Sequence, residues 1–459
     1  MKTPIDAAAQ IAITTLTKQA PAAFELAKLF KVAGFKLALV GGPVRDAILG
    51  RLGNDLDFTT DAHPKDSEKI LNKWADSVWD IGAAFGTVAG KKDEITVEIT
   101  TYRSESYDPT SRKPDVEFGK SIEADLARRD FTINAMALEL TTDEPTFIDL
   151  FNGVVDLQKK IIKTPGKPED SFSDDPLRMM RAARFMSQLN FEVDQTVLVA
   201  IKNMAARLEI ISSERIRDEF IKIMMSPSPR LGITLLVETG LADYFLPEVP
   251  KLKLEIDEHH HHKDVYEHSL TVLEQAIALE DRLAGPNLTL RLAALLHDIG
   301  KPKTKQLIAG GGVSFHHHEV VGARMCKERM KKLRFDNHII NDVSQLVFLH
   351  LRFHGYGSGE WSDSAVRRYV RDAGELLTHL HLLTRADCTT RNKTKAEGLA
   401  RTYDQLEERI QLLMQQEELN KIRPDLSGEQ IMEILEIKPS PTVGKAYDFL
   451  LELRLEHGP

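Results

Sequence analysis

The stretch GGPVRDAILGRLGNDLDFTT, residues 41–60, decides the fold of the first third of the chain. A short apolar run ends in Gly41 and Gly42, which predicts a buried strand that feeds a tight turn. VRDAILGR (44–51) predicts a short helix, and DLDFTT (55–60) alternates in the manner of a strand. We therefore expect a strand, a short helix and a second strand in close succession.

Two carboxylates lie on the second of these strands. Asp55 and Asp57 are two residues apart, so their side chains point to the same face of the strand. Adjacent carboxylates repel each other, and a hard cation such as Mg²⁺ binds carboxylate and phosphate oxygens. The glycine pair lets the backbone approach a phosphate closely, and Arg45 can clamp a phosphate from the start of the helix. A lone pair of acids is usually surface decoration, whereas this ordered set indicates metal-dependent phosphate chemistry.

Composition sets broad limits on the protein. Its 459 residues suggest about three domains. No apolar run approaches the roughly 20 residues that a membrane span needs. Two cysteines, Cys326 and Cys388, form no metal-binding spacing, so a reducing, cytoplasmic location fits best. The net charge of −9 argues weakly against a nucleic-acid partner, but a local basic groove can still bind RNA.

The pattern changes along the chain. VAGKKDEITVEITTYR (88–103) carries two more strand-like runs, and from about residue 164 helical periodicity dominates. We expect an α+β protein with a small mixed-sheet head followed by helical domains. The predicted domains are the head with its N-terminal helices (1–163), a helical neck (164–258), a third domain (259–392) and a helical tail (393–459).

Further motifs follow the two carboxylates. EADLARRDFTINAMA (123–137) contains Arg129 and Asp130, which taken alone would be read as a structural ion pair. In SDDPLRMMRAARF (173–185), Asp175 and Arg178 have the i, i+3 spacing of neighbours on one helix face. Arg181 and Arg184 extend the same face. Such spacing is most often a solvated, salt-bridged helix face.

Taken in order, these segments resemble the class II tRNA nucleotidyltransferase and bacterial poly(A) polymerase family. The family pattern is GG-x-VRD, LG and D-x-D, followed by RRD, a connector, E-D-x-x-R and ERI-x-x-E. The last three correspond to DLFNGVVDLQKKII (149–162), the segment containing Asp175, and SSERIRDEFIKIM (212–224). The resemblance covers about residues 36–225 and implies transfer of nucleotides to an RNA 3′ end without a nucleic-acid template.

The resemblance also implies roles for single residues. Asp55 and Asp57 would hold Mg²⁺, and Gly42 and Arg45 would place the triphosphate. The remaining roles implied are phosphate or base contact for Arg129, ribose contact for Asp130, base reading for Asp175 and Arg178, and triphosphate or RNA contact for Arg181 and Arg184. One Asp–Arg pair can accept both cytosine and adenine, because each offers an amine beside a ring acceptor. Asp174 stands where the family has Glu, and the loop YRSESYDPTSRKPD (102–115) is full length, which favours addition of a terminal A.

A second constellation lies downstream. Its order, H…HD…H…H…D, resembles the HD metal-dependent phosphohydrolase domain. The implied ligands are His268, His297, Asp298, His318, His350 and Asp387. Such ligands on several helices can hold one or two divalent transition metals. Lys301 follows closely and could steady a phosphate, and the run His259–His262 has no assigned purpose.

Three hypotheses follow. The first is a CCA-adding tRNA nucleotidyltransferase that uses CTP, ATP and Mg²⁺ on the tRNA 3′ end. The second, in the same class, is a poly(A) polymerase or an enzyme that adds only A, which the shared motifs do not separate from the first. The third, from another class, is an HD phosphohydrolase with an inactive head. The oligomeric state is left open.

Overall fold

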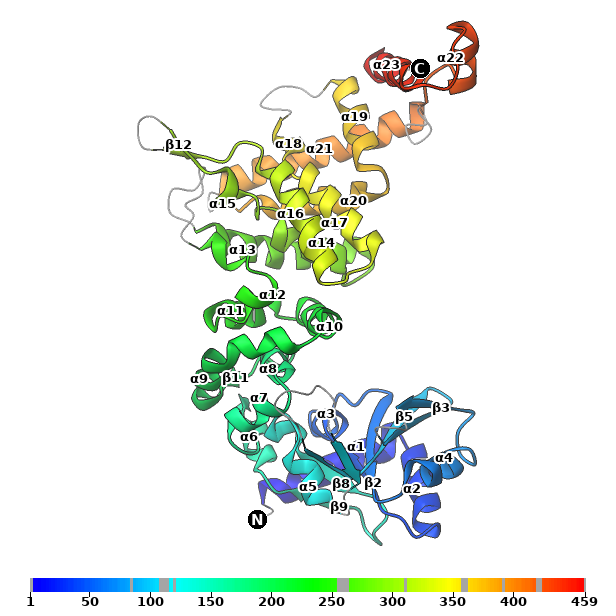
Figure 1. Ribbon diagram of the computed structural model, residues 1–459, viewed down its shortest axis with the longest axis vertical. Coiled ribbons are helices and arrows are strands. Elements are labelled where there is room, and N and C mark those ends of the chain that lie inside the picture. Colours follow the sequence, from blue (N-terminus) through cyan, green and yellow to red (C-terminus); the bar gives the residue numbers. More distant parts are fainter. Residues whose placement is uncertain are drawn as a thin grey trace. The chain divides into compact units, whose positions relative to one another are not determined.

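The computed structural model describes residues 3–82, 86–106, 115–118, 121–253, 264–308, 312–355, 362–389, 393–417 and 423–457. The chain, drawn as a ribbon in Figure 1, divides into two compact units. The first comprises Met1–Arg215 and Ser226–Tyr244, and the second comprises Ile216–Met225 and Phe245–Pro459. The domain boundaries that the sequence predicts at residues 163, 258 and 392 stay predictions.

A seven-stranded sheet forms the centre of the head, in the order β3-β4-β5-β2-β1-β8-β9. Its strands are β1 (Leu37–Val40), β2 (Asp55–Thr60), β3 (Ser77–Gly82), β4 (Thr87–Lys92), β5 (Ile95–Thr101), β8 (Met136–Glu139) and β9 (Thr146–Asp149). The pair β2 and β5 is parallel, whereas the other neighbouring pairs are antiparallel. This mixed sheet confirms the predicted fold class.

The deciding stretch forms the elements that its pattern predicts. β1 is buried along its length, α3 (Gly42–Ile48) follows the glycine pair, and β2 begins at Asp55. In β2, Leu56 and Phe58 are buried while Asp55 and Asp57 are exposed. Because strand side chains alternate between faces, burial of the two apolar residues turns both carboxylates to the opposite face.

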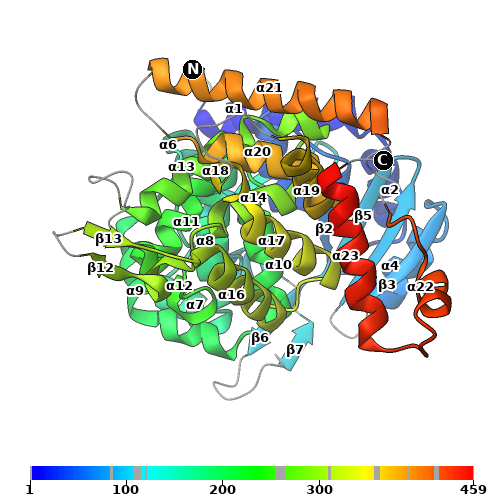
Figure 2. The same cartoon turned by 90° about the horizontal axis from the view of Figure 1, so that it is seen from above.

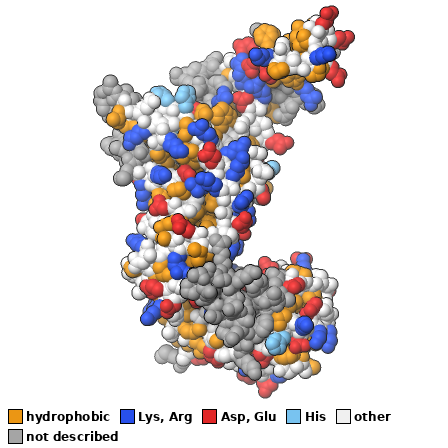
Figure 3. Space-filling view, in the orientation of Figure 1, with side chains coloured by type: hydrophobic (Ala, Val, Ile, Leu, Met, Phe, Trp, Pro, Cys, Tyr) orange, Lys and Arg blue, Asp and Glu red, His pale blue; other side chains and the backbone are white. Residues whose placement is uncertain are grey.

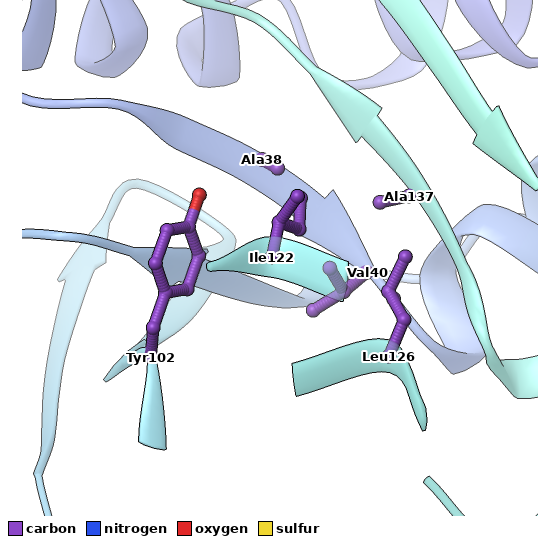
Figure 4. Packing of buried hydrophobic residues seen from close by; sticks show 6 residues of the cluster. All are labelled: Ala38, Val40, Tyr102, Ile122, Leu126 and Ala137. Carbon is purple, nitrogen blue, oxygen red and sulfur yellow. The ribbon is translucent and has the colours of Figure 1, made fainter. Parts of the chain in front are cut away.

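Apolar packing beneath β1 positions the glycine turn. Ala38 and Val40 of β1 pack with Ala137 of β8 and with Ile122 and Leu126 of α5 (Ile122–Ala127). Figure 4 shows these side chains, together with Tyr102, meeting on one side of the strand. The same packing holds α5 against the sheet, so the arginines that follow α5 lie near the end of β1.

The other head helices lie before β1, between the strands and after β9. They are α1 (Pro4–Gln19), α2 (Ala22–Val32), α4 (Pro64–Leu71) and α6 (Gly153–Lys159). The polar loop 102–115 begins with β6 (Arg103–Ser106), which pairs antiparallel with β7 (Asp115–Phe118) at the end of the loop. Residues 107–114, including Tyr107 and Arg112, lie outside the described residues.

The neck is mainly helical. Its helices are α7 (Pro168–Asp174), α8 (Leu177–Leu189), α9 (Gln195–Met204), α10 (Ser213–Met224), α11 (Pro229–Glu238) and α12 (Ala242–Phe245). One short pair of strands accompanies these helices. The two-residue strands β10 (Ile161–Ile162) and β11 (Glu192–Val193) pair parallel, because the αL residues Lys160 and Asn190 turn the chain before each.

The remainder of the second unit is also helical, apart from a hairpin of β12 (Gln306–Ile308) and β13 (Gly312–Ser314). Its helices are α13 (Val265–Ile277), α14 (Leu288–Leu296), α15 (Lys301–Thr304), α16 (His318–Lys332), α17 (Asn337–Leu349), α18 (Arg352–Gly355), α19 (Asp363–Ala373), α20 (Leu377–Asp387), α21 (Lys393–Glu417), α22 (Gly428–Ile434) and α23 (Pro441–His457). The helices α16 and α17 lie side by side in both views (Figures 1 and 2). Among the described residues, no helix is both long and apolar enough to cross a bilayer. The run His259–His262 lies outside the described residues.

Candidate functional site

Three carboxylates, rather than two, lie near one another on the exposed face of the head sheet. Asp55 and Asp57 lie on β2, and Glu98 on the parallel strand β5 is the register partner of Asp57. Glu98 is exposed, between the buried Val97 and Ile99. Sequence reasoning missed Glu98, although the alternation in ITVEITT placed it on the polar face of its strand. Its position beside Asp57 depends on the pairing of β2 with β5, which the sequence does not specify.

These carboxylates influence one another. Partial desolvation and the charge of Asp55 raise the pKa of Asp57, while Arg129 and Arg181 act in the opposite direction. Desolvation and the charges of Asp57 and Asp55 also raise the pKa of Glu98. Asp57 nevertheless remains exposed. A divalent cation would relieve this repulsion, which is the arrangement expected of a metal-binding carboxylate cluster.

The glycine turn and Arg129 fit together. Gly41 has φ = 72°, and a Cβ placed on it would lie 2.7 Å from Nη1 of Arg129. Only glycine is therefore accommodated here without displacing the guanidinium. Nη2 of Arg129 donates to the buried Asp125 at 3.2 Å, and Asp125 also accepts from Arg128 at 2.7 Å. Arg129 is thus held beside the turn, close enough to Asp57 to influence its ionisation.

Arg45 is placed differently from the prediction that it faces a phosphate. Its side chain is 7% exposed, Nη1 donates to Oδ1 of Asn134 at 2.6 Å, and Nε and Nη2 donate to Asp46. In this structure Arg45 therefore ties α3 to the segment after α5. Gly42 begins α3 directly behind the turn.

Asp130 is buried and has several partners. It accepts from the Phe131 backbone N–H at 2.9 Å, from Asn134 at 3.0 Å and from Nε of Arg181 at 2.7 Å. Burial alone would favour the protonated form, but Arg181 outweighs it and lowers the pKa of Asp130 to about 2. Asp130 thus orients Arg181 toward the carboxylate cluster, and its predicted contact with ribose hydroxyls stays a prediction.

The predicted helical pairing of Asp175 with Arg178 was wrong. α8 begins at Leu177, and Asp175 lies before it in an extended conformation, because Pro176 disfavours helical backbone in the residue that precedes it. Oδ1 of Asp175 accepts from the Leu177 backbone N–H at 3.1 Å, and Oδ2 accepts from Nη2 of Arg215 at 2.8 Å. Sequence reasoning missed Arg215, which lies 40 residues further along the chain on α10.

Arg178 connects the neck to the head. Its Nη1 donates to Oγ of Ser171 at 2.9 Å, and its Nη2 donates to the carbonyl of Arg128 at 2.6 Å. Arg184 is buried, with its guanidinium carbon 4.5 Å from the centroid of the Phe185 ring. This placement differs from the predicted exposure of Arg184 to the triphosphate or the RNA end.

The second unit brings all six predicted HD residues together. They come from five helices or helix ends: His268 (α13), His297 and Asp298 (after α14), His318 (α16), His350 (after α17) and Asp387 (α20). They form two groups that could each hold a cation. One comprises His268, His297 and Asp387, and the other comprises Asp298, His318 and His350.

Asp298 lies between the two groups. Its Oδ2 is 3.2 Å from Nε2 of His297, and its Oδ1 is 3.2 Å from Nε2 of His318. Lys301 also approaches Oδ2, at 3.0 Å. Gly300 permits this arrangement, because a Cβ placed on it would lie 2.1 Å from the carbonyl oxygen of His318. One carboxylate therefore presents an oxygen to each group, in the manner of a bridging ligand.

The outer nitrogen of each histidine is occupied. Nδ1 lies 2.9, 2.8 and 2.6 Å from the carbonyl three residues earlier in His297, His318 and His350, and 3.2 Å from Oγ1 of Thr389 in His268. All four Nε2 atoms therefore face the centre. Orientation of metal-binding imidazoles through the opposite nitrogen is typical of metal sites. Nε2 of His350 is buried without a hydrogen-bond partner among the described residues, an arrangement that a cation would satisfy.

The electrostatics agree with a cation-binding centre. Burial favours neutral His297, but Asp298 and Asp387 outweigh it and raise the pKa of His297 to about 10. Burial, together with His297 and His318, lowers the pKa of His350 to about 3. Two buried carboxylates thus attract positive charge to the centre.

The fold and these two sites define a two-part protein, with a mixed-sheet head that carries a carboxylate cluster and a helical unit that carries a histidine–aspartate cluster. Family models match the chain in the same order: "Poly A polymerase head domain" at residues 37–163, "Probable RNA and SrmB-binding site of polymerase A" at 190–252, and "HD domain" at 265–392. The chain therefore belongs to the family of proteins that carry the poly A polymerase head domain, and within it to the type with an HD domain.

Its similarity to individual proteins is consistent with this family. A CCA-adding enzyme of Ligilactobacillus salivarius (strain UCC118) is 38% identical over 56% of this chain and 63% of the relative. A CCA-adding enzyme of Limosilactobacillus reuteri (strain DSM 20016) is 44% identical over 50% of this chain and 56% of the relative. The chain thus spans about three fifths of the length of the curated relatives it matches. The Bacillus stearothermophilus CCA-adding enzyme in complex with CTP shares the fold, with a TM-score of 0.67 at 24% identity over 99% of this chain and 93% of that one.

Proposed function

We propose that this protein is a CCA-adding tRNA nucleotidyltransferase, which transfers nucleotides from CTP and ATP to the tRNA 3′ end without a nucleic-acid template. The observation that carries the proposal is the convergence of Asp55, Asp57 and Glu98 beside Arg129 and Arg181. The names of the relatives support the choice of tRNA and of both nucleotides. The two cysteines form no disulfide, which supports a cytoplasmic location.

The reaction is attack of the RNA 3′-hydroxyl oxygen on the α-phosphorus, with pyrophosphate as the leaving group. Asp55 and Asp57, with Glu98 beside them, would hold divalent cations, for which Mg²⁺ is the natural choice among oxygen ligands. Bound there, the cations would lower the pKa of the hydroxyl and stabilise negative charge on the leaving oxygens. Arg129 and Arg181 supply fixed positive charge for the triphosphate.

Base selection is assigned to Asp175 and Arg178. A carboxylate accepts from the exocyclic amine that cytosine and adenine share, and a guanidinium donates to the adjacent ring nitrogen. Uracil and guanine present the reverse order of donor and acceptor, so the same pair rejects them. Arg178 keeps its position through Ser171 and Arg128, and Asp175 keeps its position through Leu177 and Arg215.

Replacement of Arg215 tests the role of Asp175. Without the 2.8 Å contact to Nη2, the Asp175 carboxylate loses one of its two orienting partners. In R215A we expect the preference for CTP over UTP to fall about tenfold, which corresponds to about 1.4 kcal/mol. Incorporation rates over a range of CTP and UTP concentrations, which separate KM from kcat, provide the measurement.

Two further variants make this test specific. R215K retains the charge and one donor, so it should recover part of the lost preference. R217A removes the same charge from the same helix, but Arg217 contacts Asp218 and the carbonyl of Arg334 instead. Equal loss of base preference in R215A and R217A would indicate a general effect on α10 and would exclude the positioning role.

A defined transcript decides between CCA addition and its alternative in the same class. A tRNA transcript that lacks its 3′ CCA is incubated with CTP alone, ATP alone, or both. CCA addition requires two C residues with CTP alone and a complete CCA end with both nucleotides. Extension by ATP alone, without incorporation of CTP, would instead establish the poly(A) polymerase or A-adding alternative and would refute the proposal.

A second activity is proposed for the HD centre, namely metal-dependent hydrolysis of phosphoesters. It is supported by the two ligand groups joined at Asp298 and by the buried Nε2 of His350. Imidazole and carboxylate ligands suit divalent transition metals, which activate a bound water for attack on phosphorus. Lys301, whose Nζ lies 3.0 Å from Asp298, would stabilise a phosphate at this centre.

A further inference from the structure

The outer face of α16 carries an unneutralised set of positive charges. Arg324, Lys327, Lys331 and Lys332, here called the basic stripe, are all exposed. Arg324, Lys327 and Lys331 follow the i, i+3, i+7 spacing of one helix face. The opposite face of the helix is buried through His318, Gly322, Met325, Cys326 and Met330. Packing of that face therefore determines which way the basic stripe points.

Ion pairing sets the basic stripe apart from other cations of the second unit. Arg329, on the same helix, pairs with Glu248 at 2.9 Å. Arg368 and Arg371 on α19 pair with Glu452 or Glu456 of α23. No member of the basic stripe has a charged partner within 4.0 Å among the described residues. One carboxylate, Glu328, lies on the same face, which leaves a net charge of +3 on it.

This local charge opposes that of the whole chain. The protein has a formal net charge of −9, so four unpaired cations on one helix are a local exception. Lys and Arg side chains are prominent on the face of the second unit that Figure 3 shows, where α16 and α17 lie in Figure 1. An unpaired basic surface attracts a polyanion even when the protein as a whole carries a net negative charge.

We propose that the basic stripe of α16 binds the sugar-phosphate backbone of the RNA substrate. The inference rests on the proposed function for the identity of the RNA, and it extends RNA contact beyond the matched RNA-binding segment 190–252. Flexible lysine and arginine side chains on one helix face contact successive phosphates without reading bases. Binding through the basic stripe is therefore independent of sequence and sensitive to salt.

The test measures RNA binding in the absence of nucleotides. A variant of the full chain with Gln at all four stripe positions retains helix-forming residues on α16. Each lost phosphate contact lowers the slope of log K against log salt by about 0.9, so loss of three or four contacts lowers it by about 3. At about 0.15 M salt we expect at least about tenfold weaker binding of a tRNA transcript. Fluorescence anisotropy over a salt series gives both quantities.

A matched control removes the same charge elsewhere. Lys18, Lys28, Lys65 and Lys73 are exposed on or beside the helices of the head, and their fourfold Gln variant has the same net charge. We expect its salt slope to stay close to that of the wild type. An equal fall in slope for both variants, or an unchanged slope in the stripe variant, would overturn the proposal. The proposal would also be overturned if the stripe variant lost binding to anionic phospholipid vesicles but still bound RNA as the wild type does.

Failure of this inference is distinguishable from failure of the proposed function. RNA binding is measured without CTP or ATP, whereas the proposed function is tested by extension of the transcript. If the enzyme extends RNA and the stripe variant binds RNA with an unchanged salt slope, only the proposal for the basic stripe is refuted. The thermal unfolding midpoint of each variant confirms that α16 remains folded.

Discussion

Replacement of both Asp55 and Asp57 by asparagine should lower the rate of RNA extension by about 10³-fold or more. Asparagine preserves size and strand position but removes the charges that would hold a divalent cation. The cation contributes several kcal/mol to stabilisation of the transition state, and each 1.36 kcal/mol is a factor of about ten in rate. Single-turnover extension of the transcript that lacks CCA, at saturating CTP, measures this loss.

Asp143 provides the matched control. It is fully exposed in the head, and its ion-pair partner among the described residues is Lys31, so D143N changes the charge without affecting the cluster. We expect extension by D143N to match the wild type. Wild-type rates in the double variant would show that the head carboxylates are not the catalytic centre. That result would favour the third hypothesis, in which the HD centre carries the main activity.

The second large effect is expected at the HD centre. H297A combined with D298A removes one histidine from the first ligand group and the carboxylate that reaches both groups. Loss of a residue that merely orients a ligand costs about 10–100-fold in metal affinity, so loss of two ligands should cost more than about 100-fold. The metal content of protein equilibrated with a limiting transition metal, measured by mass spectrometry, reports this directly.

Two readouts separate a specific loss from unfolding. RNA extension by the head should stay within about twofold of the wild type, because the altered residues belong to a separate compact unit. His338, which is highly exposed on α17, gives the control variant H338A, and its metal content should not change. Full retention of tightly bound metal by the H297A/D298A variant would mean that these residues are not its ligands.

The sequence alone predicted the features that follow from short-range periodicity. The alternation in DLDFTT predicted β2 and the shared face of Asp55 and Asp57, because side-chain direction along a strand follows from local geometry. It did not predict the contacts that depend on pairing between distant segments of the chain. Glu98 joins the cluster only through the pairing of β2 with β5, and Asp175 is bound by Arg215, which lies 40 residues further along the chain.

Local reading also failed where one residue interrupted a pattern. The run 175–189 has helical spacing throughout, yet Pro176 moves the start of α8 to Leu177 and leaves Asp175 outside the helix. Arg45 and Arg184 carried the correct charge for a phosphate, but the sequence did not reveal their burial against Asn134 and Phe185. Burial depends on the elements that cover a residue, and those elements come from elsewhere in the chain.

The turn at Gly41 and the shared strand face of Asp55 and Asp57 could therefore be predicted from the sequence alone. Both follow from local backbone geometry and need no contact with a distant segment. The six candidate ligands of the second unit were predicted as a set from their order along the chain. Only the tertiary structure decided that Asp298 presents one oxygen to each of two groups, and that the four imidazoles face one centre through Nε2. The physical reason is that a coordination site is a property of distances between helices, and those distances are determined by packing of the whole unit.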